Sequence, residues 1–565
     1  MERAPQPDPH QEWRLGGEPD QAHRAVPARP APPSDPVRER LERPLQVVTV
    51  EHLAWFAIAL WALISRLAGV GARPLTPGEA RNALFAYDLA NRTNEASAAG
   101  FQPLWSGWVH LAGAGIFTLI GSGDFAARIL FAVSGLLLIA MAFELRHYAG
   151  RAGAIAIGAI LTLSPAVTWF SRSDTTVICA AALALVTIAL FMALKAKPGG
   201  GRAAALGMIA GAMIGADPTG VVTALIFIAS LALLGLFELL ATRNAFLRAR
   251  VWLTRYSGLA GIVILTAAAV AIASQLVLGW SGAGLAEVIG YLISPRWANW
   301  RAGVRAVILP LGFYDFQLVI AGVAGIILVA AARVRTRFAF FVLLWTLMSC
   351  ACGLLATPGA PDRILLIIVP AAFLGGVALD YLYRSRAWTA IRWVIVVLVI
   401  FTLHAQSFVN FDNDAPDPTE APWARRANLF WSEGATTRQA VERCAALVKD
   451  VSPANATVFN DGDNDWPAAL RWYLRSLRPV TSRDSAAIVV DTNGFNSDDD
   501  AARASRVDFE ESWKPDPDEL TADRALLYFF TQRAWGELVV RSALIEAGPQ
   551  AGIAAPTLIL PPNRP

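Results

Sequence analysis

Glu79 and Arg81 place an acid and a base directly after the first long apolar stretch of the chain. Thr76 and Pro77 precede them, an order typical of a helix that begins with a threonine N-cap and a proline in its first position. Apolar residues then recur at helical spacing, which predicts a short helix lying on a membrane surface. Glu79 fits two roles: the acidic partner of a Thr-x-x-Glu capping box, and a general base that takes a proton from a hydroxyl group. The local sequence leaves both open.

Arg172 and Asp174 form a second charged pair, at the end of another apolar stretch. Asp174 begins the next predicted helix, where a carboxylate interacts favourably with the helix dipole, so an N-cap is one interpretation. The other rests on convergence, because Glu79, Arg172 and Asp174 are predicted at the same rim of the membrane domain. Ionisable groups at membrane depth are costly, and those that converge are candidates for function. We predict Glu79, Arg172 and Asp174 as residues of one functional site.

Arg296 and Arg301 lie among tryptophans in a long loop between two apolar stretches. A guanidinium group binds a phosphate through two parallel hydrogen bonds, and indole rings favour the level of lipid headgroups. The pattern suits a lipid phosphate, and ordinary headgroup anchoring is the alternative. We predict that Arg172, with Arg296 or Arg301, holds the phosphate of a lipid-linked substrate.

The composition is that of a membrane protein. Of the 565 residues, 55% are hydrophobic and 16% are charged, and apolar runs long enough to cross roughly 30 Å of hydrocarbon recur along the chain. The net charge of +3 is too small to indicate nucleic acid as a partner. The four cysteines have neither metal-ligand nor disulfide spacing, and the sequence has no Walker motif, dinucleotide-binding loop or His/Cys cluster. We therefore predict no metal and no cofactor.

Twelve apolar runs lie between residues 52 and 409, and basic residues crowd into alternate loops between them. The positive-inside rule places such loops in the cytoplasm. The rule is satisfied throughout if residues 103–121 lie along the outer surface instead of crossing the membrane. The predicted fold class is therefore mainly α: a polytopic membrane protein of about 11 transmembrane helices, with surface helices in the first outer loop.

Three regions are expected along the chain. Residues 1–50 are rich in Pro and charge and poor in large apolar residues, which predicts a disordered cytoplasmic tail. Residues 51–409 form the transmembrane domain. The composition of residues 410–565 shifts toward Asp, Asn and Pro, and this region is predicted to be a small extracytoplasmic α/β domain. Its expected elements are a helix at 441–451, short strands at 456–459 and 487–490, and a helix or strand pair at 525–542.

Short motifs follow one another in a recognisable order. They are Glu79-Ala80-Arg81, Gln102-Pro103-Leu104, Gly121-Ser122-Gly123-Asp124-Phe125-Ala126-Ala127-Arg128, Ser164-Pro165, Ser171-Arg172-Ser173-Asp174, Thr357-Pro358 and Arg471-Trp472-Tyr473. Together they resemble the GT-C membrane glycosyltransferases of family 39, which include protein mannosyltransferases and the aminoarabinose transferases of lipid A. Within that family the sequence looks most like the bacterial and archaeal proteins described as flippase-activity-associated.

The resemblance implies transfer of a sugar from a polyprenyl-phosphate donor to a lipid, glycan or protein acceptor, on the outer face of the cell inner (cytoplasmic) membrane. It also implies that Glu79 is the catalytic base on the acceptor hydroxyl and that Asp174 orients the acceptor or the partner of the base. Arg81 and Gln102 are expected to bind substrate. The acidic pair of the family's first loop reads Gly78-Glu79 here, and its His-Pro-Pro reads Gln102-Pro103-Leu104. A membrane glycosyltransferase is the leading hypothesis. The alternative is a non-catalytic partner that binds or flips a lipid-linked glycan.

Overall fold

The computed structural model describes fourteen stretches of the chain and a few further residues between them. These stretches are 49–93, 105–241, 245–278, 300–331, 336–355, 363–385, 388–410, 457–460, 468–475, 477–480, 482–491, 506–516, 519–533 and 535–547. The chain divides into two compact units, Met1–Leu53 and Ala54–Pro565, and the second unit contains all the described strands and nearly all the described helices. Two predicted regions lie outside the described residues: the tail predicted over 1–50, of which residues 1–48 are not described, and the helix predicted at 441–451.

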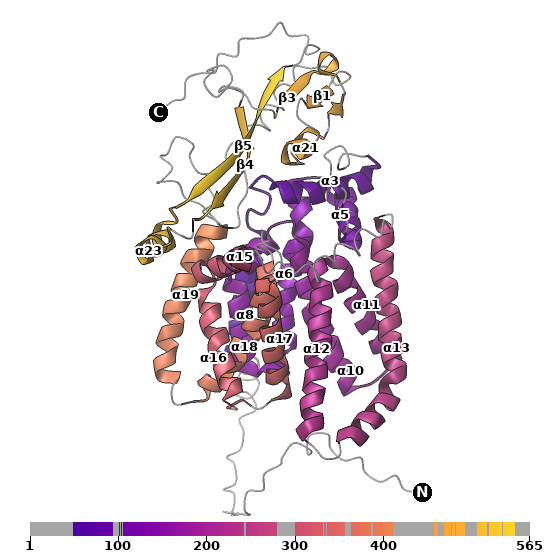
Figure 1. Ribbon diagram of the computed structural model, residues 1–565, viewed down its shortest axis with the longest axis vertical. Coiled ribbons are helices and arrows are strands. Elements are labelled where there is room, and N and C mark those ends of the chain that lie inside the picture. The colour runs from indigo at the N-terminus through magenta and orange to yellow at the C-terminus, as the bar shows by residue number, and fades with distance from the viewer. Residues whose placement is uncertain are drawn as a thin grey trace, which may run out of the picture. The chain divides into compact units, whose positions relative to one another are not determined.

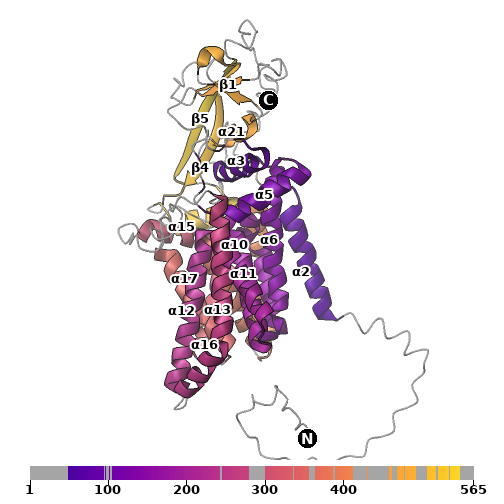
Figure 2. The ribbon, with the colours of Figure 1, turned by 90° about the vertical axis from the view of Figure 1, so that its right-hand side faces the viewer.

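Most of the described chain is helical, and the longer helices run side by side (Figures 1 and 2). In chain order the helices are α2 (Val50–Leu67), α3 (Pro77–Asn91), α5 (Gly107–Ile120), α6 (Asp124–Glu144), α7 (Arg146–Ala149), α8 (Arg151–Leu163), α9 (Pro165–Ser171), α10 (Thr176–Ala196), α11 (Gly200–Ala216), α12 (Pro218–Ala241), α13 (Ala245–Val277), α15 (Trp300–Phe313), α16 (Phe316–Ala330), α17 (Arg337–Leu355), α18 (Ile364–Tyr383) and α19 (Trp388–Asn410).

The protein is a multi-pass membrane protein. Among the described residues, seven helices are long and apolar enough to cross a membrane, and the number rises to nine if each of two bent helix pairs counts as one crossing. The bent pairs are α8 with α9, at 64°, and the end of α15 with α16, at 102°. The sequence predicts about 11 crossings. The difference arises because α11 and the Arg337–Gly353 part of α17 are apolar but shorter than 18 residues.

Helix α5 stays at the end of the bundle where α3 lies, which we call the α3 end. At its start Ser106 donates a hydrogen bond to the carbonyl of Ala216, the last residue of α11. Near its other end, Phe117 packs against Trp472, with ring centroids 5.8 Å apart. Its 14 residues make a helix of about 21 Å, which is too short to span the hydrocarbon core. This placement agrees with the prediction that residues 103–121 lie along the surface.

Cysteines placed before and after α5 test this placement. In a background without native cysteines, Asn91→Cys and Gly123→Cys should react with an impermeant thiol reagent from the same side of the membrane, because both positions are exposed and flank a helix that does not cross. Lys197→Cys, at the far end of α10, is the matched control and should react from the other side only. Reaction of Gly123→Cys from the Lys197 side would show that α5 crosses.

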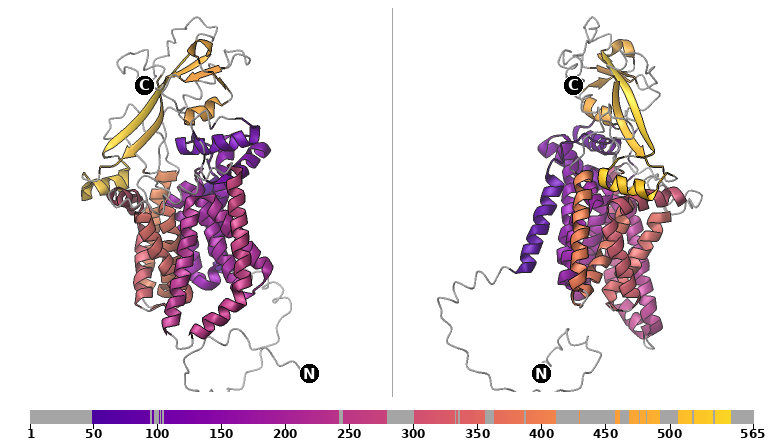
Figure 3. Two further views of the ribbon diagram at one scale, coloured as in Figure 1. Left: turned by 45° about the vertical axis from the view of Figure 1, so that its right-hand side comes forward. Right: turned by 90° about the vertical axis from the view of Figure 1, so that its left-hand side faces the viewer.

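The C-terminal part of the chain contains a small α/β element (Figure 3). Its five-stranded sheet has the order β2-β1-β3-β5-β4, with β1 parallel to β2 and β3, and β5 antiparallel to β3 and β4. The strands are β1 (Thr457–Asn460), β2 (Arg478–Pro479), β3 (Ile488–Asp491), β4 (Arg506–Lys514) and β5 (Glu537–Ala547), and the helices are α21 (Ala468–Leu474) and α23 (Ala522–Thr531). The strands predicted at 456–459 and 487–490 match β1 and β3 to within a residue. The stretch 525–542 contains most of α23 and the first half of β5.

A second hydrophobic cluster, separate from the core of the bundle, joins the α/β element to α3. Its fully buried members include Leu75 and Leu84 around α3 and Trp472 on α21, and Phe117 of α5 packs with them. Burying such side chains contributes roughly 1.5–3 kcal/mol each. The cluster therefore fixes α3, and with it Glu79, against both α5 and α21.

Candidate functional site

Glu79 completes a capping box at the start of α3. The hydroxyl of Thr76 accepts a hydrogen bond from the Glu79 amide at 3.3 Å, and the Thr76 amide donates to Glu79 Oε2 at 2.8 Å. Pro77 follows in the first turn, where its missing N–H has no helical partner to lose. The capping interpretation offered by the sequence is therefore correct as local geometry.

The carboxylate of Glu79 has partners beyond its own helix. Arg128 of α6 binds both oxygens, with Nε 2.8 Å from Oε1 and Nη2 2.8 Å from Oε2. The amide of Asp174 donates to Oε1 at 2.9 Å, and Arg73 lies 3.6 Å from the same oxygen. Burial alone would raise the pKa of Glu79, but the charges of Arg128 and Arg73 and the hydrogen bonds from Arg128 and Thr76 outweigh it and lower the pKa to about 2. Glu79 is therefore an ionised, fully hydrogen-bonded carboxylate.

Arg128 ties the loop before α3 to the start of α6. Its side chain is completely buried, and besides Glu79 it donates to the carbonyls of Val70, Arg73 and Pro74 at 2.8–2.9 Å. From the sequence, the motif that ends in Arg128 supports only the family resemblance, and Arg128 is not predicted as a site residue. A charged residue inside an apolar stretch is the signal that points to a role.

Asp174 lies beside Glu79, in the link between α9 and α10, with only 6% of its surface exposed. Among the described residues, Asn82 of α3 is the one that donates a hydrogen bond to its carboxylate, from Nδ2 to Oδ1 at 3.4 Å. Burial raises the pKa of Asp174 well above its usual value, and the nearby negative charge of Glu79 raises it further. Two neighbouring acids thus have opposite properties: Glu79 holds its charge, and Asp174 binds a proton readily.

Two arginines interact with Glu79, and a third, Arg172, lies close to both of them. Arg128 binds Glu79, Arg73 lies over the ring of Trp169 at 3.9 Å from its centroid, and Arg172 is 9% exposed. Burial lowers the pKa of Arg172 to about 10, and the charges of Arg73 and Arg128 add to that effect. Three guanidinium groups against two carboxyl groups leave the site with an excess of positive charge. This arrangement favours a negatively charged ligand such as a phosphate.

Helix α21 holds the site from the side of the α/β element. The hydroxyl of Tyr473 accepts a hydrogen bond from the Leu75 amide at 2.8 Å and donates to Asp124 Oδ2 at 2.9 Å. Trp472 donates to the other oxygen of Asp124 at 2.9 Å, and Arg475 stacks on the Trp472 ring at 3.8 Å. Asp124 begins α6, one turn before Arg128. Helix α21 therefore holds both the residues just before α3, which carries Glu79, and the start of α6, which carries Arg128.

Tyr473→Phe should weaken this connection. Removing the hydroxyl leaves the Leu75 amide without its acceptor, and a buried donor that loses its partner costs about 1–3 kcal/mol. We expect a lower unfolding temperature in a thermal-shift measurement on the purified protein. Tyr87→Phe is the matched control: in the described part of the chain the Tyr87 hydroxyl makes no hydrogen bond, although its ring packs on Trp472, so its unfolding temperature should not change. Equal effects of the two substitutions would contradict the bridging role of Tyr473.

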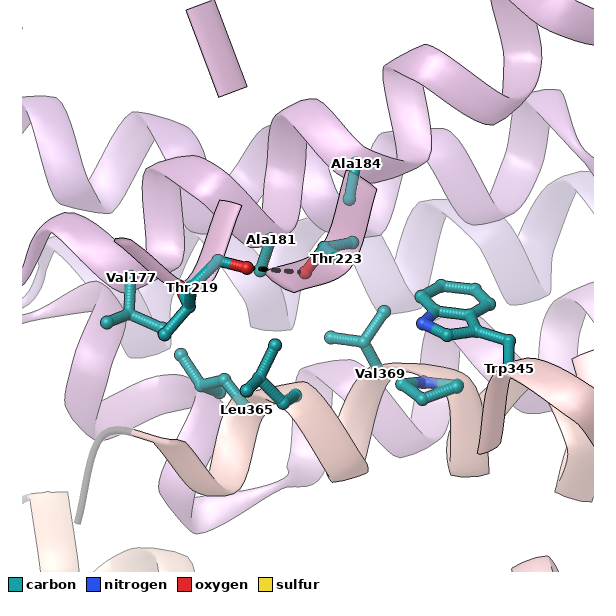
Figure 4. Close-up of a pocket in the computed structure, with 10 residues that line it drawn as sticks. Val177, Ala181, Ala184, Thr219, Thr223, Trp345, Leu365 and Val369 are labelled. Atoms are coloured by element: carbon teal, nitrogen blue, oxygen red, sulfur yellow. Dashed lines mark hydrogen bonds between the residues drawn. The ribbon is translucent and has the colours of Figure 1, made fainter. Parts of the chain in front are cut away.

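A small apolar groove lies between α10, α12, α17 and α18. Figure 4 shows side chains of α18 facing those of α10 and α12 across it. Its lining consists of Val177, Ala181, Ala184, Thr219, Thr223, Trp345, Leu365, Leu366, Val369 and Pro370. Val177 is the lining residue nearest to Asp174 along the chain, three residues after it.

Comparison with known proteins identifies the fold. No family model matches the chain, and no curated protein matches it. Solved structures do match it. Among them are ArnT from Cupriavidus metallidurans in the apo state, with 14% identity and a TM-score of 0.51, and ArnT from the same organism bound to undecaprenyl phosphate, with 16% identity and a TM-score of 0.52. Both alignments cover 78% of this chain and 93% of ArnT. ArnT is an aminoarabinose transferase with the GT-C fold. The chain has the GT-C fold. The fold implied by the sequence resemblance is confirmed.

The GT-C fold brings together three of the residues that the sequence singles out, namely Glu79, Arg172 and Asp174. Arg81 is exposed on α3. Gln102 and Arg296 lie outside the described residues, and so does the side chain of Arg301, which belongs to α15. In the described part of the chain, no group of three or more His, Cys, Asp or Glu side chains could hold a metal ion.

Proposed function

We propose that this GT-C protein is a membrane glycosyltransferase, which moves a sugar from a polyprenyl-phosphate donor to a hydroxyl group of a lipid, glycan or protein acceptor. The observation that carries the proposal is the pair of buried acids, Glu79 and Asp174, with three arginines close by. An apolar groove, whose lining begins three residues after Asp174, adds to it. The site suits a substrate with a phosphate head and a long apolar tail. The ArnT structure solved with undecaprenyl phosphate supports the same class of lipid.

In the proposed reaction Asp174 is the general base. It takes the proton of the acceptor hydroxyl as the acceptor oxygen bonds to the anomeric carbon, and the bond from that carbon to the phosphate oxygen breaks. The electron pair of that bond leaves with the phosphate, which departs as polyprenyl phosphate. A base works best when its pKa is near the working pH, and the raised pKa of Asp174 favours this role.

Glu79 is assigned a positioning role instead of the base role that the sequence predicts. Each of its oxygens already accepts two hydrogen bonds, and its pKa of about 2 makes it a weak proton acceptor. By accepting the Asp174 amide, Glu79 holds the backbone that carries the base. Its negative charge also raises the pKa of Asp174.

In this proposal the arginines bind the phosphate of the donor, and the groove binds the start of its polyprenyl chain. Arg73 and Arg172 neutralise the donor phosphate, together with Arg296, from the segment before α15, and Arg301, in the first turn of α15. Arg81 and Gln102 are proposed to contact the sugar or the acceptor. The groove lined by α10, α12, α17 and α18 is proposed to receive the isoprene units next to the phosphate, which its branched apolar side chains would contact.

The proposed location is the inner (cytoplasmic) membrane, with the α3 end and the α/β element on the outer side and the N-terminus in the cytoplasm. The distribution of charge supports this orientation. Arg146 begins α7, Arg151 begins α8 and Lys197 follows α10, all at the end of the bundle opposite α3. Positive charge at the ends of membrane helices favours the cytoplasmic side.

A second candidate is a partner that binds or flips a lipid-linked glycan without catalysis. One observation favours it: Gly78 stands where the family has an acid, and the remaining acid, Glu79, is saturated with hydrogen bonds. Both candidates require a polyprenyl-phosphate lipid in the groove. They differ in the role of Asp174, which accepts the proton of the acceptor hydroxyl in the glycosyltransferase and has no catalytic role in the binding partner.

Filling the groove tests the lipid part of the proposal. Ala181→Phe places a ring among the lining residues, and it should weaken binding of undecaprenyl phosphate about tenfold or more, a loss of at least about 1.4 kcal/mol. Native mass spectrometry of the protein with added lipid measures the bound fraction. Val397→Phe adds the same ring on the exposed side of α19 and should leave binding unchanged. Equal binding by Ala181→Phe and the parent protein would mean that the lipid does not occupy this groove.

A further inference from the structure

Helix α23 presents large apolar side chains on two sides. On one side Tyr528 is fully buried. On the other, Leu526, Leu527 and Phe530 are 60%, 49% and 58% exposed. Three such side chains on a ten-residue helix form a contiguous apolar surface, and exposed surfaces of this kind mark contacts with another apolar partner.

The buried side of α23 rests on the helix bundle. The ring of Phe529 lies 5.4 Å from that of Phe401 on α19 and 5.9 Å from that of Phe316 on α16. Tyr528 packs on Phe313 at 4.9 Å. Figure 3 (right) shows α23 lying across the end of the bundle near α19. The helix is therefore seated against membrane-spanning elements, although it belongs to the sequence between β4 and β5.

The contact lies at the edge of the lipid-facing surface of α19. Along that helix the exposed apolar side chains run from Trp393, at 64%, through Ile400, at 60%, to Leu403, at 38%. The next residue is His404, whose ring is 6.0 Å from that of Phe529. Because α23 meets α19 where its apolar surface gives way to polar residues, its own exposed apolar face continues the lipid-facing surface at the membrane boundary.

We propose that α23 is an interfacial helix, and that Leu526, Leu527 and Phe530 enter the lipid leaflet on the side of the α/β element. Amphipathic helices of this kind bury their apolar face about 5–10 Å into the boundary between headgroups and acyl chains. The polar first turn, with exposed Asp523 and Arg524, remains at headgroup level. Since α23 connects β4 to β5, it anchors the sheet to the membrane surface independently of what the site does.

Quenching by spin-labelled lipids tests this proposal on the full chain. The four native cysteines are replaced, Leu526→Cys is labelled with bimane, and the protein is reconstituted into phosphatidylcholine vesicles that contain doxyl-labelled acyl chains. Ile400→Cys on α19 is the lipid-facing reference, and Asp484→Cys, exposed on the α/β element, is the water-facing reference. We expect quenching at position 526 comparable to that at position 400, and little at position 484.

Two results would overturn the proposal. Quenching of the 526 label by iodide in solution but not by the doxyl lipids would place the apolar face in water. Protection from both quenchers would mean that another segment of the chain covers the face. All three positions are exposed, so the labelled variants should fold, and an unchanged unfolding temperature checks this for each.

Discussion

Asp174→Asn should reduce sugar transfer by about 10²–10⁴-fold, the usual contribution of a positioned general base. Asparagine keeps the size of the side chain and its contact with Asn82, but it cannot accept the hydroxyl proton. The backbone amide that binds Glu79 is unchanged, so the fold should persist. Transfer is measured as the glycan product formed by a deletion strain that carries the variant gene at wild-type protein levels.

The matched control for this substitution is Asp88→Asn. Asp88 is another acid of α3 whose pKa burial raises, but its carboxylate binds Thr93 and the Ala96 amide, away from Glu79. Its replacement should leave transfer nearly unchanged. Full transfer by Asp174→Asn would remove Asp174 from the chemistry and favour the non-catalytic candidate.

Glu79→Gln should destabilise the protein by about 3–5 kcal/mol, because it leaves Arg128 buried without its counter-charge. If Glu79 were only a cap partner, glutamine would preserve the capping box and stability would hold. Thr76→Ala is the matched control, since it removes the cap and keeps the ion pair; it should cost about 0.5–2 kcal/mol. Denaturant unfolding in detergent compares the two variants. A smaller loss for Glu79→Gln than for Thr76→Ala would contradict the account of the ion pair.

The same substitution should move the pH dependence of transfer. The negative charge of Glu79 raises the pKa of Asp174, so its removal lowers that pKa. Transfer is lost as pH falls through the pKa of the base, and this acidic limit should therefore shift to lower pH in Glu79→Gln. If Glu79 were itself the base, transfer would fall by about 10²-fold or more at every pH. Rates across the pH range, at a temperature where both proteins are folded, separate these outcomes.

The stability of the wild type should also depend on pH through Glu79. Its pKa falls from 4.5 to about 2 in the folded protein, so its ionised form stabilises the fold above about pH 4.5. That stabilisation is lost progressively as pH falls toward 2. Glu79→Gln lacks the titrating group, and the stability difference between the two proteins should shrink over this range.

The features of the site that depend on neighbouring residues could be predicted from the sequence. The capping box at Thr76 and Glu79 follows from residue types at fixed spacing, and the structure has it. The meeting of Glu79 with Asp174 followed from the order of the apolar runs and the distribution of basic loops. The break between α8 and α9 coincides with Ser164-Pro165, where proline cannot continue the helix ladder.

Contacts between distant segments could not be predicted in this way. Arg128 lies 49 residues from Glu79, and Tyr473 lies 349 residues from Asp124, so no spacing rule links them. The base role predicted for Glu79 rests on its type and position, but its proton affinity depends on partners that only the folded chain supplies. Strand β4 has a charged, irregular sequence, Arg506–Lys514, and its pairing with β5 comes from tertiary contacts.

Mass spectrometry of lipid-linked sugars and surface glycans, in a strain from which the gene has been deleted, tests the central claim most directly. If the protein is a glycosyltransferase of this kind, the deletion strain should accumulate one polyprenyl-phosphate-linked sugar, and one of its glycans should lack the corresponding sugar residue. The wild-type gene should restore both, and the Asp174→Asn gene should restore neither. Unchanged lipid-linked sugars and glycans in the deletion strain would contradict the claim that this protein transfers a sugar from a polyprenyl-phosphate donor.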